Sequence, residues 1–223
     1  MRLFRSPRGA AAEFARTSAP PSQRPWRQAR WCAIDLELTG LNPRKDRIIS
    51  VGAIPIEGGR VILGKGLYTL VRTTRRSEIG ALLVHKLRVS DLSDAPPIDQ
   101  ALDFLFRMLA GSVPVFHTAM VEQAFLSKLF AQRGVRLPAA ADTEVLGRLW
   151  RLRRDGNAPP SLPLAMLSAN LGIRPEAPHH ALADALTTAQ AFVALASHLD
   201  ADGPQTVGSL VAASEITSVR RLG

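Results

Sequence analysis

Apolar and polar residues along the first half of the chain are patterned as extended strands. Residues 31–36 form a short apolar run that ends at an acid, which is typical of a buried strand. A second β-rich stretch covers residues 48–56, and the glycine pair within 57–60 predicts a hairpin into a third strand at 61–71. Three strands joined in this way predict an antiparallel meander at one side of a sheet.

The second half of the chain has a helical period instead. Apolar residues recur every three or four positions over 98–109 and predict an amphipathic helix, which a short strand at 113–116 follows. Further helices are predicted at 119–133, from Thr143 towards Arg153, from a Ser161 cap to Gly172, and at 180–198. Strands followed by alternating helices and strands predict an α/β fold, with a mixed β-sheet flanked by helices in a single domain at 31–199.

The two ends of the chain depart from this pattern. Residues 1–30 carry seven arginines and one acid among prolines and serines, and this composition predicts a disordered basic N-terminal arm. A transit peptide has a similar bias and is the alternative interpretation. Gly203-Pro204 interrupts the chain, and residues 200–223 form a C-terminal tail whose structure the pattern does not define.

Charge and composition narrow the function classes. The net charge is +9; the seven arginines and one acid of residues 1–30 give +6 of it, which leaves +3 for residues 31–223. A basic arm would strengthen salt-dependent binding to a polyanion, although a merely solubilising tail explains it equally well. The single cysteine, Cys32, excludes a disulfide framework and a cysteine-based zinc cluster, and it suits a reducing cytoplasm. No apolar stretch approaches the roughly 20 residues of a membrane span.

Two acids stand two positions apart near the end of the first predicted strand. Residues i and i+2 of a strand point to the same face, so Asp35 and Glu37 would project together, about 6–7 Å apart along the strand. Their carboxylates repel one another unless a cation lies between them, and hard oxygen ligands suit magnesium or manganese. Taken alone, the pair is explained more simply as two solvated charges at a strand end.

Two further stretches carry candidate chemistry. Glu122 shares a helical face with the apolar Phe125 and Leu126. It therefore lies either at the edge of this apolar face or points into the protein, where it would bind a ligand. Prolines end the segment before His179, and a helix then begins that carries Asp184. A histidine in a loop and a carboxylate on a neighbouring helix form a plausible base and metal ligand. Taken alone, such histidines are more often surface or capping residues.

Together these stretches resemble the DnaQ-like 3′→5′ exonucleases of the DEDDh group, whose fold is ribonuclease H-like. The likeness covers residues 30–199 in order and spacing. The first family motif, Asp-x-Glu followed by a glycine, is matched at 35–40, and the third, His-x-Ala-Leu-x-Asp-Ala, at 179–185. The second motif is matched in outline at 117–126, and Asp142-Thr143 resembles the Asp-Thr between the second and third motifs.

The resemblance implies a mechanism with two divalent ions, Mg²⁺ or Mn²⁺. Asp35 would bridge the ions, Glu37 and Asp184 would complete the site on the nucleophile side, and Glu122 would help to hold the ion at the leaving group. His179 would accept a proton from the attacking water. The main chain at Leu38 and Thr39 would receive the terminal nucleotide, and Leu41 would wedge against its base or be an ordinary loop residue.

The implied substrate is the 3′ end of single-stranded DNA or RNA, with DNA favoured, in DNA repair or proofreading and with a polymerase or repair partner possible. Degradation of very short RNAs is a variant of the same chemistry. The chain also departs from the family pattern, because Glu122 replaces an aspartate, Thr118 an asparagine and Val121 a phenylalanine. The alternative function is therefore a catalytically impaired nucleic-acid-binding module that retains the exonuclease fold.

Overall fold

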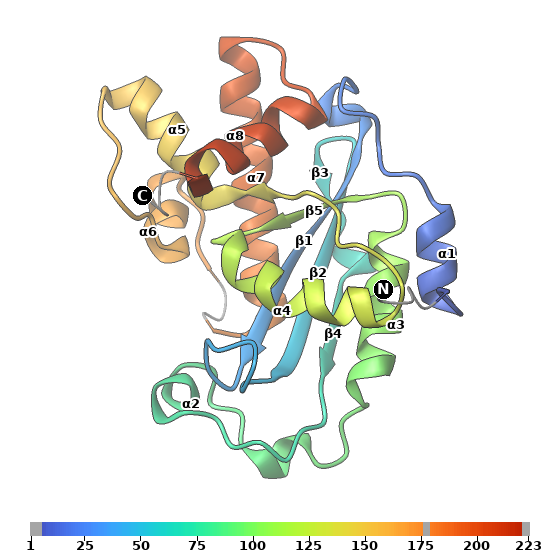
Figure 1. Ribbon diagram of the computed structural model, residues 1–223. Coiled ribbons are helices and arrows are strands. Elements are labelled where there is room, and N and C mark those ends of the chain that lie inside the picture. Colours follow the sequence, from blue (N-terminus) through green and yellow to red (C-terminus); the bar gives the residue numbers. More distant parts are fainter. Residues whose placement is uncertain (1–5, 176–178, 220–223) are drawn as a thin grey trace.

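The core of the molecule is a mixed β-sheet in the order β3-β2-β1-β5-β6, with β4 also paired to β2 (Figure 1). A computed structural model describes residues 6–175 and 179–219. The strands are β1 (Arg30–Leu38), β2 (Ile48–Glu57), β3 (Arg60–Val61), β4 (Leu67–Leu70), β5 (Val113–Phe116) and β6 (Ala141–Asp142). The β1–β2, β2–β3 and β2–β4 pairs are antiparallel, whereas β1–β5 and β5–β6 are parallel. The expected mixed sheet with a meander on one side is confirmed.

Helices cover both faces of this sheet. One face carries α1 (Ala10–Arg16), α3 (Ile98–Leu109) and α4 (Ala119–Gln132), and the other carries α5 (Thr143–Asp155), α6 (Leu164–Asn170), α7 (Ala181–Asp202) and α8 (Val207–Val219). Side chains that alternate along β1 contribute to the apolar cores on both faces of the sheet. Ile34 and Leu36 pack on the first face, and Trp31 and Ala33 pack on the second. The small helix α2 (Ile79–His85) lies outside these layers (Figure 1).

The expected third strand is interrupted. Instead of running from 61 to 71, the chain forms β3, then a short 3₁₀ turn at Leu63–Lys65, then β4. Gly64 lies within this turn and Gly66 directly follows it, and glycine within a strand pattern weakens the strand. The helix expected to start from a Ser161 cap begins at Leu164 with Pro163 as its N-cap, so that capping prediction is wrong.

The prediction of a disordered N-terminal arm is also wrong for most of its length. Residues 10–16 form α1, and the Phe14 ring packs against Phe106 and Phe130 with ring centroids 5.5 and 5.9 Å apart. Trp26 is 1% exposed and belongs to the core on the other face. The prediction failed because it relied on the arginine-rich composition and overlooked three apolar residues on one face of α1. Residues 1–5 of the expected arm lie outside the described part of the chain.

Part of the expected C-terminal tail forms the helix α8, Val207–Val219, which packs against α5 and β6. An isolated bridge between Pro25 and Thr206 joins the two flanking segments. Among the helices within residues 6–175 and 179–219, none combines the length and apolarity that a bilayer span requires.

Phe14→Ala tests whether the N-terminal segment is part of the fold. We expect the free energy of unfolding to fall by about 2–4 kcal/mol, because a buried aromatic ring is lost from between two others. Urea unfolding followed by circular dichroism measures this change. The exposed Arg16→Ala on the same helix is the matched control, and an equal, negligible effect of both variants would contradict the packing of α1.

Candidate active site

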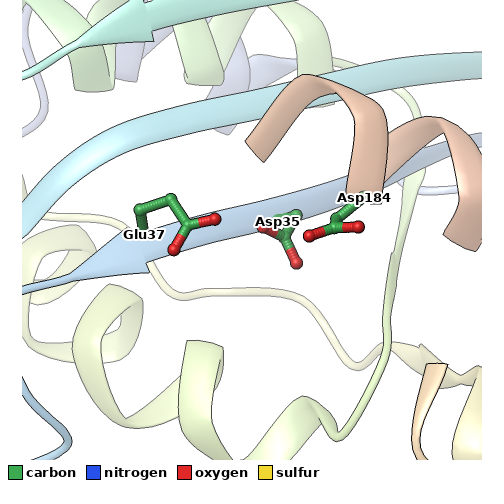
Figure 2. A group of neighbouring side chains, drawn as sticks. All are labelled: Asp35, Glu37 and Asp184. Carbon is green, nitrogen blue, oxygen red and sulfur yellow. The ribbon is translucent and has the colours of Figure 1, made fainter. Parts of the chain in front are cut away.

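Three carboxylates meet at the end of β1. Asp35 and Glu37 lie on β1, and Asp184 lies in the first turn of α7. One carboxylate oxygen of each residue lies within 4.8 Å of those of the other two. Figure 2 shows the three side chains side by side, with Asp35 drawn between Glu37 and Asp184. The strand periodicity thus predicts the first pair correctly, and the fold adds the third acid from a residue about 150 positions later.

The contact between α7 and β2 explains why Asp184 reaches this position. Gly52 on β2 pairs with Asp35 across the β1–β2 ladder. A Cβ atom on Gly52 would overlap with the main-chain carbonyl of Ala181 and lie 2.5 Å from the amide nitrogen of Leu182. The first turn of α7 therefore rests directly on the strand backbone, beside Asp35. A glycine inside a strand is a known sign of such a close approach, and this signal in the sequence was missed.

Burial makes ionisation of these acids costly. The pKa of Asp35 is raised well above its usual range by burial, and further by the charges of Glu122, Glu37 and Asp184. Burial and then the charge of Asp184 raise the pKa of Glu37 to about 7. Burial also raises the pKa of Asp184, while the hydrogen bond from the main chain of His179 opposes that shift. A cation among these oxygens would remove the penalty.

Glu122 adds a fourth acid from α4. Its side chain is 7% exposed, burial raises its pKa to about 8, and its Oε2 atom has no hydrogen-bond partner among the described residues. Its charge is close enough to Asp35 to raise the pKa of that residue, although it does not belong to the group of three. Four carboxylates with an unpartnered buried oxygen are a donor set that fits Mg²⁺ or Mn²⁺.

Asp142 fixes the helix that carries Glu122. Its two carboxylate oxygens accept hydrogen bonds from the main-chain N–H groups of Thr118 (3.1 Å) and Ala119 (2.9 Å), at the start of α4. Oδ1 also accepts from Glu144 N–H (2.9 Å) and so caps α5. The N–H of Asp142 itself donates to Ser214 Oγ (2.8 Å) on α8. The sequence analysis noted Asp142-Thr143 only as a family likeness, although an aspartate before a helix is itself a capping signal.

The two histidines of the third motif occupy different environments. His179 is exposed and lies in the left-handed region, with φ 65°, and its main-chain N–H donates to Asp184 Oδ2 (2.8 Å). His180 is the N-cap residue of α7, and its ring stacks on Tyr68 of β4 with centroids 4.4 Å apart and planes 26° apart. Pro178, which precedes this pair, lies outside the described residues. No motif or periodicity in the sequence indicates that Tyr68 is part of this site.

The residues expected to receive a nucleotide lie at the end of β1 and in the segment that directly follows it. Leu38 is buried, whereas Leu41 is 74% exposed. The main-chain N–H of Thr39 donates to the carbonyl of Arg47 (2.9 Å), and its carbonyl accepts from the N–H of Glu78 (2.7 Å). The main chain of Thr39 is therefore engaged within the protein, and Leu41 is the member of this group with an open side chain.

The chain matches the model of a known protein family over most of its length. The exonuclease family model, RNase_T, matches residues 32–192, which include every acid described above. The chain belongs to this exonuclease family. The resemblance found from the sequence motifs is thereby confirmed.

Curated relatives are similar over most of the chain. The chain is 30% identical over 207 residues to a DNA polymerase III subunit epsilon-like protein of Rhodobacter capsulatus, covering 91% of this chain and 28% of that protein. It is 27% identical over 173 residues to the 3′-5′ exonuclease DinG of Bacillus subtilis, covering 76% of this chain and 18% of that protein. The chain therefore spans less than a third of the length of these relatives.

Solved structures of exonucleases share the fold. Exonuclease X in complex with 5′ overhanging duplex DNA matches with a TM-score of 0.60 and 19% identity, covering 82% of this chain and 98% of that one. Escherichia coli exonuclease I in complex with a dT13 oligonucleotide matches with a TM-score of 0.64 and 18% identity, and the match covers 78% of this chain and 42% of that one. These matches confirm the expected fold class.

Gly52→Ala tests whether the close approach of α7 places Asp184. The added methyl group must push the first turn of α7 off β2, so we expect the affinity for Mn²⁺ to fall at least about tenfold and stability to drop by about 1–3 kcal/mol. Isothermal titration calorimetry and thermal unfolding measure the two effects. Gly64→Ala is the matched control, since a Cβ atom there meets nothing within 4 Å. Unchanged Mn²⁺ affinity in Gly52→Ala would show that the contact does not position the acid.

The raised pKa values predict how stability depends on pH without metal. An acid whose pKa is raised on folding stabilises the folded state at pH values where it is protonated. For Glu37 and Glu122 this stabilisation is lost as the pH rises from 4.5, their ordinary pKa, through their pKa values in the folded protein of about 7 and about 8. Asp35→Asn removes one of the repelling charges. In the presence of a chelator we expect it to raise Tm by about 3 °C or more near pH 8 and by less near pH 5.

Thermal unfolding at the two pH values measures this difference. Asp94→Asn, which removes an exposed acid, is the control. Equal gains at both pH values would contradict the mutual repulsion of the buried carboxylates.

Proposed function

We propose that this chain is a metal-dependent 3′→5′ exonuclease of the DEDDh group that removes nucleotides from the 3′ end of single-stranded nucleic acid, with DNA favoured over RNA. The observation that carries the proposal is the convergence of Asp35, Glu37 and Asp184, whose oxygens lie within 4.8 Å of one another although they come from β1 and α7. Buried acids gathered in this way are costly to hold without a cation.

The donor set supports two Mg²⁺ or Mn²⁺ ions as cofactors. Asp35 has acids on both sides and would be the bridging ligand, with Glu37 and Asp184 beside it. Glu122, whose Oε2 is buried without a described partner, would bind on the leaving-group side. When bound, such ions activate water and offset the charge that develops on phosphate oxygens. Glutamate in place of the family aspartate keeps the negative charge. The buried carboxylate of Glu122 is close enough to Asp35 to raise its pKa, which supports a catalytic site over an impaired binding module.

His179 would act as the general base. It is exposed at the edge of the acidic group and would take the proton of the attacking water at its imidazole ring. The hydrogen bond from its main-chain N–H to Asp184 Oδ2 ties the base to one of the proposed metal ligands.

The relatives support single-stranded DNA as the favoured substrate. They include proteins named for DNA polymerase III, and the structural neighbours include exonuclease I with a dT13 oligonucleotide. The exposed Leu41 would wedge against the terminal base, next to main chain at Leu38 and Thr39. The same likeness supports the proposal of a role in DNA repair or proofreading, with a polymerase or repair partner.

A strand-degradation assay tests the proposal. We expect 5′-labelled single-stranded DNA to shorten from the 3′ end with Mg²⁺ or Mn²⁺, RNA to be degraded more slowly, and Asp35→Ala to lower the rate by at least about a thousandfold, because an electrostatic element of the site is lost. A denaturing gel gives the product ladder. Asp94→Ala, which removes an exposed acid on a turn and outside the group of four acids, is the matched control.

Two other outcomes would change the assignment. Faster degradation of short RNA than of DNA would make the protein an oligoribonuclease. A wild-type protein that binds strands and cleaves none would be a binding module, and Glu122→Asp would then be the variant expected to restore cleavage.

A further inference from the structure

The main chain of His179 adopts a conformation that is uncommon for residues other than glycine. A residue other than glycine in the left-handed region, here with φ 65°, carries strain of about 1–3 kcal/mol. Such strain persists where the surroundings fix the chain on either side. The side chain of His179 is exposed, so the restraint has to come from its main-chain hydrogen bond to Asp184 and from the neighbouring residues.

The next residue, His180, is held by a ring contact. Its imidazole stacks on the phenol ring of Tyr68, with centroids 4.4 Å apart and planes 26° apart. His180 is at the same time the N-cap residue of α7, with an extended backbone. The ring stack therefore holds the residue at which the loop becomes a helix.

Tyr68 is well placed to act as a fixed support. It lies on β4, where it pairs with Gly52, and Gly52 pairs with Asp35 on β1. The three residues form one row across three strands, and directly opposed residues in such a row lie on one face of the sheet. The first turn of α7 sits over the middle of this row, at Gly52, and Tyr68 and Asp35 flank it.

Two contacts thus restrain the strained residue, one from its own main chain to the acidic group and one from the following residue to β4. The main-chain N–H of His179 donates to Asp184 Oδ2, and the side chain of His180 rests on Tyr68. Burial raises the pKa of Tyr68, and the charge of Glu37 raises it further. Without the ring stack, His179 would keep one anchor and could relax out of the left-handed region.

We propose that Tyr68 is a positioning residue, whose stack with His180 holds the His179 side chain in place for proton transfer at the carboxylate site. The inference rests on the proposed function, in which His179 is the base. It separates the placement of the base from metal binding, because Tyr68 touches neither Asp35 nor Asp184 through a described hydrogen bond.

The first test compares two substitutions of the same side chain. Tyr68→Leu removes the ring, and we expect kcat to fall about 10- to 100-fold with KM and Mn²⁺ affinity unchanged, because a displacement of about 1 Å in a catalytic group has an effect of that size. Tyr68→Phe keeps the stack and is expected to retain kcat within about threefold. Equal kcat in wild type and Tyr68→Leu would overturn the proposal, as would a loss confined to Mn²⁺ affinity.

A double-mutant cycle separates positioning from general destabilisation. If Tyr68 acts through His179, Tyr68→Leu has no further effect on kcat in a His179→Ala background. A fall by the same factor in both backgrounds would show that the ring only stabilises the fold. Thermal unfolding of all four proteins confirms that each is folded at the assay temperature.

A readout independent of cleavage distinguishes failure of this inference from failure of the proposed function. In the wild-type protein and in Tyr68→Phe, the aromatic ring should shift the imidazole proton signals of His180 in NMR spectra, and those of His179 should change when the ring is lost in Tyr68→Leu. If the wild type cleaves no strand, the proposed function fails. Unchanged histidine signals in Tyr68→Leu would overturn the positioning role itself.

Discussion

The contact between the first turn of α7 and the backbone of β2 is the constraint on which the site depends. At Gly52 the helix touches main-chain atoms, and no side chain separates the two elements. Along the rest of α7 small residues continue the close packing, because Ala185, Ala189 and Ala196 are fully buried against the same face. A helix lying this near the sheet brings Asp184 to the level of Asp35. Larger residues would lift the helix and open the group of acids.

The fold accepts an electrostatic cost at this point. Asp35 sits where burial and three neighbouring acids all oppose its ionisation. Such a cluster lowers the stability of the protein by itself, and its retention is typical of sites where function is obtained at the expense of stability. The two apolar cores on either side of the sheet offset this cost, since β1 is buried on both faces over most of its length.

Sequence patterns predicted the parts of the molecule that depend on local periodicity. The helix at 98–109 was predicted with its observed bounds, and the shared face of Asp35 and Glu37 follows from the strand period. Position-specific packing was not predictable in this way. Helix α1 lies in an arginine-rich segment, where composition outweighed its short apolar face.

The site itself combines residues that no local pattern connects. Tyr68 and His180 are 112 positions apart, and their ring contact exists only because β4 and α7 meet at β2. The acids were found from motifs whose order and spacing match a family, whereas their distances come from the fold. The two kinds of information are complementary, because motifs identify the chemistry and packing determines its geometry.

Asp142 has a consequence for how the chain could vary during evolution. One side chain fixes the starts of α4 and α5, and its main chain is held by Ser214. In the segment between α4 and β6, residues 133–140, Val135 and Ala140 are buried in the core, whereas Arg136 and Ala139 are exposed. Changes of chain length at these exposed positions can be accommodated while Asp142 still fixes the starts of α4 and α5, so homologous chains are free to differ in length there while Glu122 keeps its place.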